Sequence, residues 1–129
     1  MEFNGQYLTY EEYRALGGTL DLMPFNLLEF RSRKEIDKPT YGRLKDLKEQ
    51  VQEVKVCDFD LINKINVFIK NENRDRSVSS ENTDGYSVTF NDINKEFTQQ
   101  EKLEIASTID TYLSECKLED GTPYLYRGV

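Results

Sequence analysis

The chain has 129 residues and a formal net charge of −7, with 37% hydrophobic and 32% charged residues. This length predicts one domain, residues 1–129, with a modest core, and the acidic charge argues against a protein that binds nucleic acid by neutralising phosphates. Histidine is absent, so the commonest general base and the commonest metal ligand are both missing. No apolar stretch is long enough to span a membrane, so we expect a soluble protein.

The first predicted element is a short helix over residues 10–16. Thr9 and Glu12 have the spacing of a capping box, in which each side chain accepts a hydrogen bond from a backbone N–H of the first turn. Gly17 and Gly18 follow and favour the left-handed conformation that ends many helices. A helix this short depends on tertiary contacts for its stability.

A second helix is predicted from Pro24, a residue favoured in a first turn, to about Asp37, with Pro39 as its stop. Ser32 is the small member of its apolar stripe, at a point where another helix can come close. The alternative of a catalytic serine has no His or Lys arrangement behind it, and we reject it. The helix-packing residues of this stripe are Phe25, Leu28, Ser32 and Ile36.

The longest predicted helix spans about residues 51–71 and forms the centre of the core. Val56 and Phe59 lie off its main stripe, so a second, partly apolar face is expected to meet a neighbouring subunit. The main stripe consists of Val54, Cys57, Leu61, Ile65 and Phe68, widened by Ile62 and Ile69.

Residues 71–85 are rich in Asn, Ser, Asp and Arg and are predicted to form an exposed loop. After this loop, Tyr86, Val88 and Phe90 alternate with polar residues, which predicts a short β-strand or hairpin. A single strand leaves its own backbone unpaired, so its partner must come from elsewhere in the chain or from another protomer.

The last predicted helix begins after a second capping box, formed by Thr98 and Glu101, and ends near Lys117. The predicted fold class is therefore mainly α, a small bundle of about four helices with one short β segment and an extended C-terminal tail. The expected apolar stripe of the last helix is Leu103, Ala106, Ile109, Leu113 and Cys116.

The chain closes on the apolar sequence GTPYLYRGV, although terminal segments are usually polar. Burying four of these side chains returns about 6 to 12 kcal/mol, whereas ordering the nine residues costs about 9 to 18 kcal/mol. Backbone pairing would tip this balance, so we expect residues 119–129 to form an extended assembly arm. On this hypothesis deletion of residues 123–129 leaves helicity nearly intact. The expected interface residues are Tyr86, Val88, Phe90, Tyr124, Leu125, Tyr126 and Arg127.

The sequence contains no pattern that indicates an enzyme or a cofactor site. Asp58 and Asp60 are two residues apart on a helix, so they point in different directions, and no phosphate-binding glycine motif occurs. Cys57 and Cys116 lack metal-ligand spacing and are expected to be reduced packing residues, although a disulfide between them stays open. We therefore expect no catalysis, no metal and no cofactor.

Three segments resemble a family of small head–tail connector, or adaptor, proteins of tailed bacteriophages and of prophages of Gram-positive bacteria. They are YLTYEEYRALGGTLDLMPFNLLEFRSRKEIDKPTYGRL at residues 7–44, DGYSVTF at 84–90 and DGTPYLYRGV at 120–129. The resemblance covers the chain from about Tyr7 to its end and is weakest over residues 45–82. It also places Arg43 directly after a glycine turn at Gly42.

This resemblance implies a mostly helical structural protein of the virion, with no enzyme activity. Copies of the subunit would form an oligomeric ring, dodecameric in the virion, below the portal protein at the head–tail interface. The ring would join the portal to the next connector or tail protein. DNA would pass through its acidic channel during packaging without sequence-specific binding. Before assembly the subunit would reside in the host cytoplasm.

Two other functions stay open at this point. A non-enzymatic, phage-encoded adaptor or regulatory module that binds one protein partner would use the same tyrosine-rich ends of the chain. A small hydrolase working through carboxylates would require a carboxylate with a shifted pKa in a pocket. Five of the eight tyrosines lie near the two ends, at Tyr7, Tyr10, Tyr13, Tyr124 and Tyr126.

Overall fold

The computed structural model describes residues 5–47, 49–76, 94 and 96–125. Within these residues the chain is mainly helical, which confirms the predicted fold class. The predicted strand over Tyr86, Val88 and Phe90 lies outside the described residues, as do Tyr126 and Arg127. The described elements are α1 (Tyr10–Ala15), α2 (Leu22–Thr40), the 3₁₀ helix η1 (Arg43–Asp46), α3 (Gln52–Arg76) and α4 (Gln99–Leu113).

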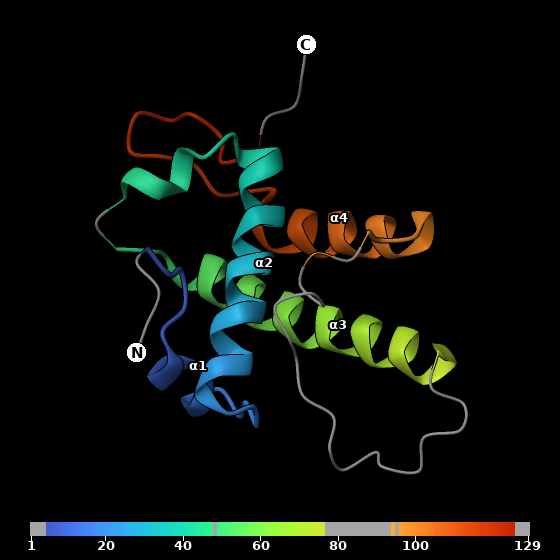
Figure 1. The fold of residues 1–129 in the computed structure, drawn as a ribbon. Helices are drawn as coiled ribbons and strands as arrows, with labels where there is room; N and C mark the ends of the chain where they lie inside the picture. Colours follow the sequence, from blue (N-terminus) through green and yellow to red (C-terminus); the bar gives the residue numbers. More distant parts are fainter. Residues whose placement is uncertain (1–4, 48, 77–93, 95, 126–129) are drawn as a thin grey trace.

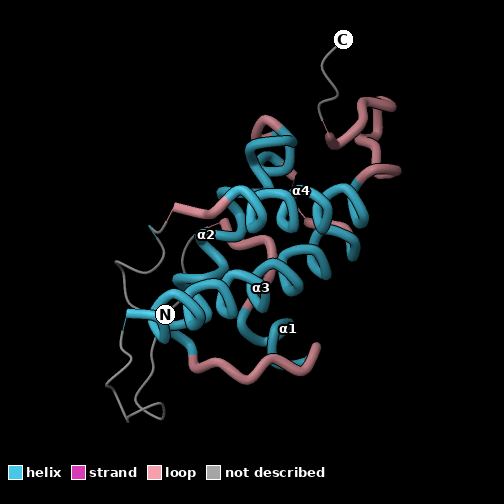
Figure 2. The backbone as a smooth tube through the Cα atoms, turned by 90° about the vertical axis from the view of Figure 1, so that its right-hand side faces the viewer, coloured by secondary structure: helices cyan, strands magenta, loops and turns pink. Residues whose placement is uncertain are grey.

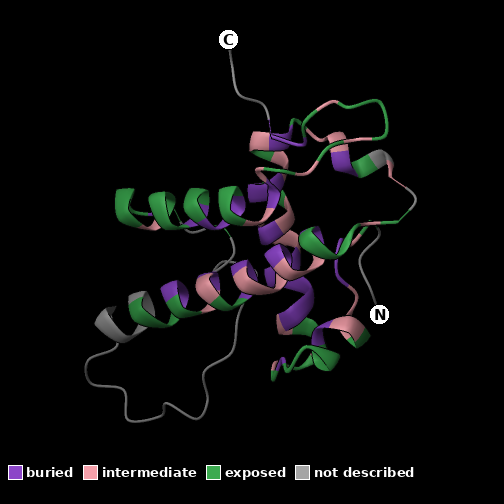
Figure 3. Ribbon diagram, turned by 180° about the vertical axis from the view of Figure 1, so that it is seen from behind, coloured by how far each residue is buried: buried purple, intermediate pink, exposed green. Residues whose placement is uncertain are grey.

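The helices α3 and α4 lie side by side, and α2 crosses them near one end of the pair (Figures 1 and 2). α1 packs against the first part of α2, and η1 packs against its last part (Figure 1). In Figure 3 buried residues gather on α2 and along α3, whereas α4 is exposed along the face turned to the viewer. Residues at most 1% exposed include Phe25, Leu28, Ile36, Leu61, Ile65 and Leu113.

The N-terminal helix α1 forms where the sequence predicts it, one residue shorter. The capping box is present, because the Glu12 N–H donates to Thr9 Oγ1 at 3.1 Å and the Thr9 N–H donates to Glu12 Oε1 at 3.0 Å. Gly18 is required just after the helix, because a Cβ there would lie 2.2 Å from the ring of Tyr13. The Tyr13 hydroxyl in turn accepts a hydrogen bond from the Thr19 N–H at 3.1 Å. This contact folds the chain closely around one aromatic side chain.

Helix α2 is longer than predicted at both ends, because it begins at Leu22 and contains Pro39 in its last turn. Proline removes one backbone N–H, but the helix continues for one more residue before it ends. The helix ends at Tyr41, whose φ of 53° lies in the left-handed region. After this residue, the Gly42 N–H donates to the Asp37 carbonyl at 3.1 Å. The prediction that Pro39 stops this helix is therefore wrong.

Helix α3 continues to Arg76, so residues 71–76 belong to the helix and not to the predicted loop. The off-stripe residue Phe59 lies 5.7 Å from the ring of Tyr13, measured between ring centroids. Phe59 thus packs against α1 of the same chain, and the expected contact of this face with a neighbouring subunit stays a prediction. The predicted main stripe is buried at Val54, Cys57, Leu61, Ile62, Ile65, Phe68 and Ile69.

Helix α4 begins at the predicted capping box and ends at Leu113 rather than near Lys117. Its predicted stripe is buried at Ile109 and Leu113, but not at Leu103 and Ala106. Leu103 is 55% exposed. Thr108 is buried in its place because its hydroxyl accepts a hydrogen bond from Lys64 Nζ at 2.7 Å and donates one to the Glu104 carbonyl at 2.8 Å. A polar residue with satisfied hydrogen bonds can lie on the inner face of a helix. The buried residues of α4 are Ile105, Thr108, Ile109 and Leu113.

The closing segment turns back on its own chain. The Leu118 N–H donates to the Thr122 carbonyl at 2.7 Å, and the Tyr124 N–H donates to the Cys116 carbonyl at 2.9 Å. Tyr124 and Leu125 are only 3% and 8% exposed. These two side chains are therefore core residues of the protomer, whereas Tyr126 and Arg127 of the expected assembly arm lie outside the described residues. A turn of a few residues brings the paired backbones together at a low entropic cost of loop closure.

Both cysteines are free thiols, so the structure does not join Cys57 and Cys116 in a disulfide. Burial is the main cause that raises the pKa of each thiol, and nearby carboxylates raise it further. Cys57 is fully buried on α3 and acts as a small apolar packing residue.

Candidate partner-binding groove

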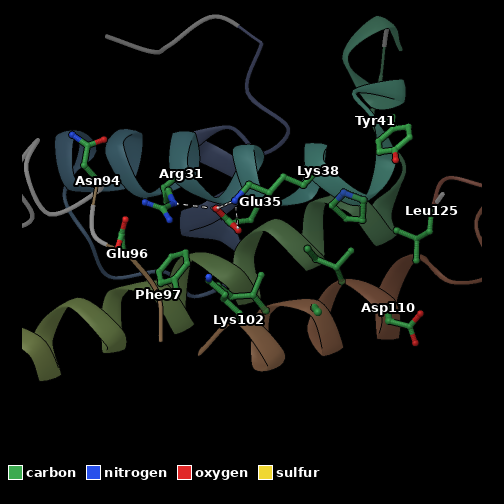
Figure 4. A pocket seen from close by; sticks show the side chains of 14 residues that line it. Arg31, Glu35, Lys38, Tyr41, Asn94, Glu96, Phe97, Lys102, Asp110 and Leu125 are labelled. Atoms are coloured by element: carbon green, nitrogen blue, oxygen red, sulfur yellow. Dashed lines mark hydrogen bonds and ion pairs between the residues drawn. The ribbon is translucent and has the colours of Figure 1, made fainter. Parts of the chain in front are cut away.

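An open groove with a volume of about 1040 Å³ lies between α2 and α4 (Figure 4). Asn94, Glu96 and Phe97 stand at one end, and Leu125 stands at the other. One wall comes from α2 and the residue that follows it, namely Arg31, Glu35, Lys38, Pro39 and Tyr41. The other wall comes from α4 and consists of Lys102, Ile105, Ala106, Ile109 and Asp110.

The α2 wall carries a charged row centred on Glu35. The Glu35 carboxylate accepts from Arg31 Nε at 3.1 Å and from Lys38 Nζ at 3.2 and 3.1 Å, as the dashed lines in Figure 4 show. These residues are four and three positions apart, so they share one face of the helix. The Glu35 side chain is 9% exposed and that of Lys38 is 69% exposed, so the acid lies deep and the cation faces the solvent.

The floor of the groove is apolar and rests on the core. The Arg31 guanidinium lies 4.2 Å from the centre of the Phe97 ring, a cation–π contact. Phe97 meets Phe68 of α3 edge to face, with 6.0 Å between the ring centroids. Ile105 and Ile109 of the α4 wall and Leu125 at the far end add apolar surface to the lining and are each at most 8% exposed. An apolar floor between charged rims fits a polypeptide segment better than a small polar substrate.

A smaller hollow of about 530 Å³ lies between α3 and α4. Its side chains bond to one another: Tyr112 donates from its hydroxyl to Asp60 Oδ2 at 3.2 Å, and Lys64 Nζ lies 3.6 Å from the same oxygen. Partial burial and the Asp60 carboxylate raise the pKa of the Tyr112 phenol. This network joins α3 to α4, so we interpret it as a structural contact between the two helices.

The predicted site residues that the structure describes are two interface residues and five helix-packing residues. Tyr124 and Leu125 are buried, and Leu125 also lines the groove. The Ser32 hydroxyl has no hydrogen-bond partner among the described residues and is enclosed in the protein. The predicted helix-packing residues Leu28, Ser32, Ile36, Leu61 and Ile65 are all buried.

Two acidic residues that were not among the predicted site residues are completely buried, Glu29 on α2 and Asp58 on α3. A signal for them exists in the spacing. Glu29 is four residues after Phe25, and Asp58 is four residues after Val54, so both acids fall on apolar stripes. An acid at such a position predicts a buried charge or a buried proton.

The sequence does not indicate the groove, because its two walls come from α2 and α4 and depend on how these distant helices pack. Among the residues that the structure describes, no cluster of Cys, Asp and Glu side chains is suited to hold a metal ion. None of the described helices combines the length and the apolar composition needed to cross a bilayer. Comparison with known proteins found no matching family model, no matching curated protein and no matching solved structure.

Proposed function

We propose that this protein is a head–tail connector subunit of a tailed bacteriophage or prophage. Copies of the chain form a ring below the portal protein, join it to the next connector or tail protein and surround the DNA channel. The protein acts by binding other protein chains, and it resides in the virion after assembly in the host cytoplasm.

The observation that carries this proposal is the open groove between α2 and α4. Its floor is apolar, its rims are charged, and its volume of about 1040 Å³ accommodates several side chains of a partner. We infer that the occupant is a neighbouring copy of the same chain. The groove residues Arg31, Lys38 and Lys102 balance Glu35, Glu96 and Asp110, so the groove is neutral while the chain carries −7. An acidic copy therefore meets less repulsion at the groove than over the average surface.

A second feature is a contact between the opening and closing segments of the resemblance, residues 7–44 and 120–129. Arg43 Nη1, in the segment after the glycine turn, donates to the Pro123 carbonyl at 2.6 Å and to the Tyr124 carbonyl at 3.4 Å. The opening and closing segments that resemble the connector family are thus parts of one packed unit. The groove lies against both of them, through α2 and through Leu125.

Ala106→Glu is a direct test of the groove. Ala106 is exposed on the groove wall of α4, so a glutamate there keeps a good helix former but places a charge in the groove. Ser107→Glu is the matched control, because Ser107 is the next exposed residue and lines the other hollow. We expect the Ala106 variant to be lost from particles and the Ser107 variant to be retained, with equal helicity in both.

The readouts are mass spectrometry of purified particles and light scattering after size-exclusion chromatography, with and without portal-containing heads. Equal incorporation of both variants would show that the groove is not the contact between subunits. A stoichiometric soluble complex with one other protein, together with absence from particles, would favour the single-partner adaptor over the connector.

A further inference from the structure

The carboxyl groups of Glu29 and Asp58 contact each other inside the protein, where α2 packs against α3. Glu29 of α2 and Asp58 of α3 are both 0% exposed, and neither lines a groove of the described structure. Burying one charge in a protein interior is costly, and burying two like charges together costs more. The pair therefore requires an explanation beyond helix packing.

Glu29 has the partners that a buried carboxylate needs. Its Oε1 accepts from Arg33 Nε at 2.9 Å, and its Oε2 accepts from the Tyr7 N–H at 3.1 Å. The Arg33 side chain is itself only 14% exposed, so this ion pair is largely shielded from water. One negative charge at this position is thus compensated.

Asp58 lacks such partners. The neighbouring Ser32 hydroxyl and the Arg33 cation favour its carboxylate form, but among the described residues no hydrogen bond of standard geometry reaches either of its carboxyl oxygens. Burial first, and then the negative charge of Glu29, raise the pKa of Asp58 well above its ordinary value. Two carboxyl groups in contact can form a hydrogen bond only when one of them carries a proton.

We propose that Glu29 and Asp58 hold one proton between them, carried by Asp58, and that this proton makes the crossing of α2 and α3 a pH-sensitive joint. With the proton bound, Asp58 donates to the Glu29 carboxylate, and the site holds a single compensated charge. Without it, two buried carboxylates face one arginine, and the packing of α2 against α3 weakens. The inference concerns the protomer itself and does not depend on the proposed function.

The groups that act on the pair come from three elements. The N-terminal segment contributes Tyr7, whose phenol donates to Asp37 Oδ1 at 2.5 Å and whose pKa is raised by burial and by that carboxylate, so it stays neutral. α2 contributes Ser32 and the cation of Arg33. α3 contributes the thiol of Cys57 next to Asp58, which burial also keeps neutral. Arg33 is thus the cation that opposes the shift on Asp58.

The direction of the pH effect follows from the raised pKa of Asp58. The folded protein keeps this proton at a pH where the unfolded chain has released it, so the folded state binds more protons. The contribution of this proton to stability is fully present below the ordinary pKa of aspartate, about 4, and it is lost as the pH rises through the folded-state pKa of Asp58. One linked proton raises the unfolding constant up to about tenfold per pH unit.

The test is urea unfolding of the full chain at intervals between about pH 5 and pH 8, a window below the ordinary pKa of thiols and above those of exposed carboxylates. Asp58→Asn is the informative variant, because its amide donates to Glu29 as the protonated acid does but does not titrate. Asp110→Asn is the matched control, since Asp110 is an exposed aspartate on α4.

We expect the unfolding constant of the wild type and of the Asp110 variant to rise at least about tenfold across this window. We expect that of the Asp58 variant to stay nearly constant. Equal pH dependence of all three proteins would overturn the proposal. If the Asp58 variant does not fold, infrared spectroscopy of the wild type decides the question near neutral pH. A protonated-carboxyl band that disappears at higher pH supports the shared proton, and its absence at neutral pH rules it out.

Discussion

Helix α2 carries the same ion-pair spacing on two of its faces, and the two pairs lie in different surroundings. Glu29 and Arg33 lie at the crossing with α3, where their side chains are 0% and 14% exposed. Arg31 and Glu35 line the groove toward α4, where the side chains are 17% and 9% exposed and Lys38 adds a second cation. Glu29 instead has a second buried acid beside it. The local spacing fixes which residues pair, and the tertiary neighbours decide what the pair contributes.

The largest expected effect is the loss of stability when the buried ion pair at the crossing loses its cation. Arg33→Met leaves the fully buried Glu29 without its cation, so we expect a loss of about 3 to 5 kcal/mol in the free energy of unfolding. Urea denaturation at neutral pH measures this loss.

Arg31→Met on the groove face is the matched comparison. Glu35 keeps Lys38 as a partner there, so we expect a loss of only about 1 kcal/mol, part of it from the contact with Phe97. Equal losses in the two variants would contradict this comparison. They would mean that Glu29 at the crossing depends on its arginine no more than Glu35 in the groove does.

The second prediction concerns how much the buried side chain of Leu125, at one end of the groove, contributes to the free energy of unfolding. Leu125→Ala removes a side chain that is 8% exposed, so we expect a loss of about 2 to 5 kcal/mol and a lower melting temperature. Leu103→Ala is the control, because Leu103 is 55% exposed and its loss should stay within about 0.5 kcal/mol. If the Leu125 variant were as stable as the control, the closing segment would be an arm after all.

The smallest predicted effect is the loss of a capping box, which we expect to be equal beside α2 and beside the groove. Thr9→Ala and Thr98→Ala each remove one capping box, the first beside α2 and the second beside the groove. We expect each to cost about 1 kcal/mol, since a cap is a local hydrogen bond. Thermal unfolding followed by circular dichroism measures both, and a severalfold difference between them would show that tertiary contacts dominate even at a cap.

Much of the helical structure was predictable because its signals are local. Both capping boxes form as predicted, and the main stripe of α3 is buried as predicted. The end of α2 was not, because the left-handed Tyr41 ends the helix and Pro39 does not. The groove was not predictable either, since its walls come from α2 and α4, which are far apart in the sequence.

The sequence by itself determined the mainly helical fold class, the approximate positions of the helices and the two caps, because these signals depend on residues that are close in the sequence. Only the tertiary structure decided which face α4 buries, where Lys64 of α3 satisfies the hydroxyl of Thr108. It also decided that Tyr124 and Leu125 join the core and that Glu29 meets Asp58. These outcomes depend on the packing of distant segments, because the free energy of burying a polar side chain depends on the partners it meets as well as on its own polarity.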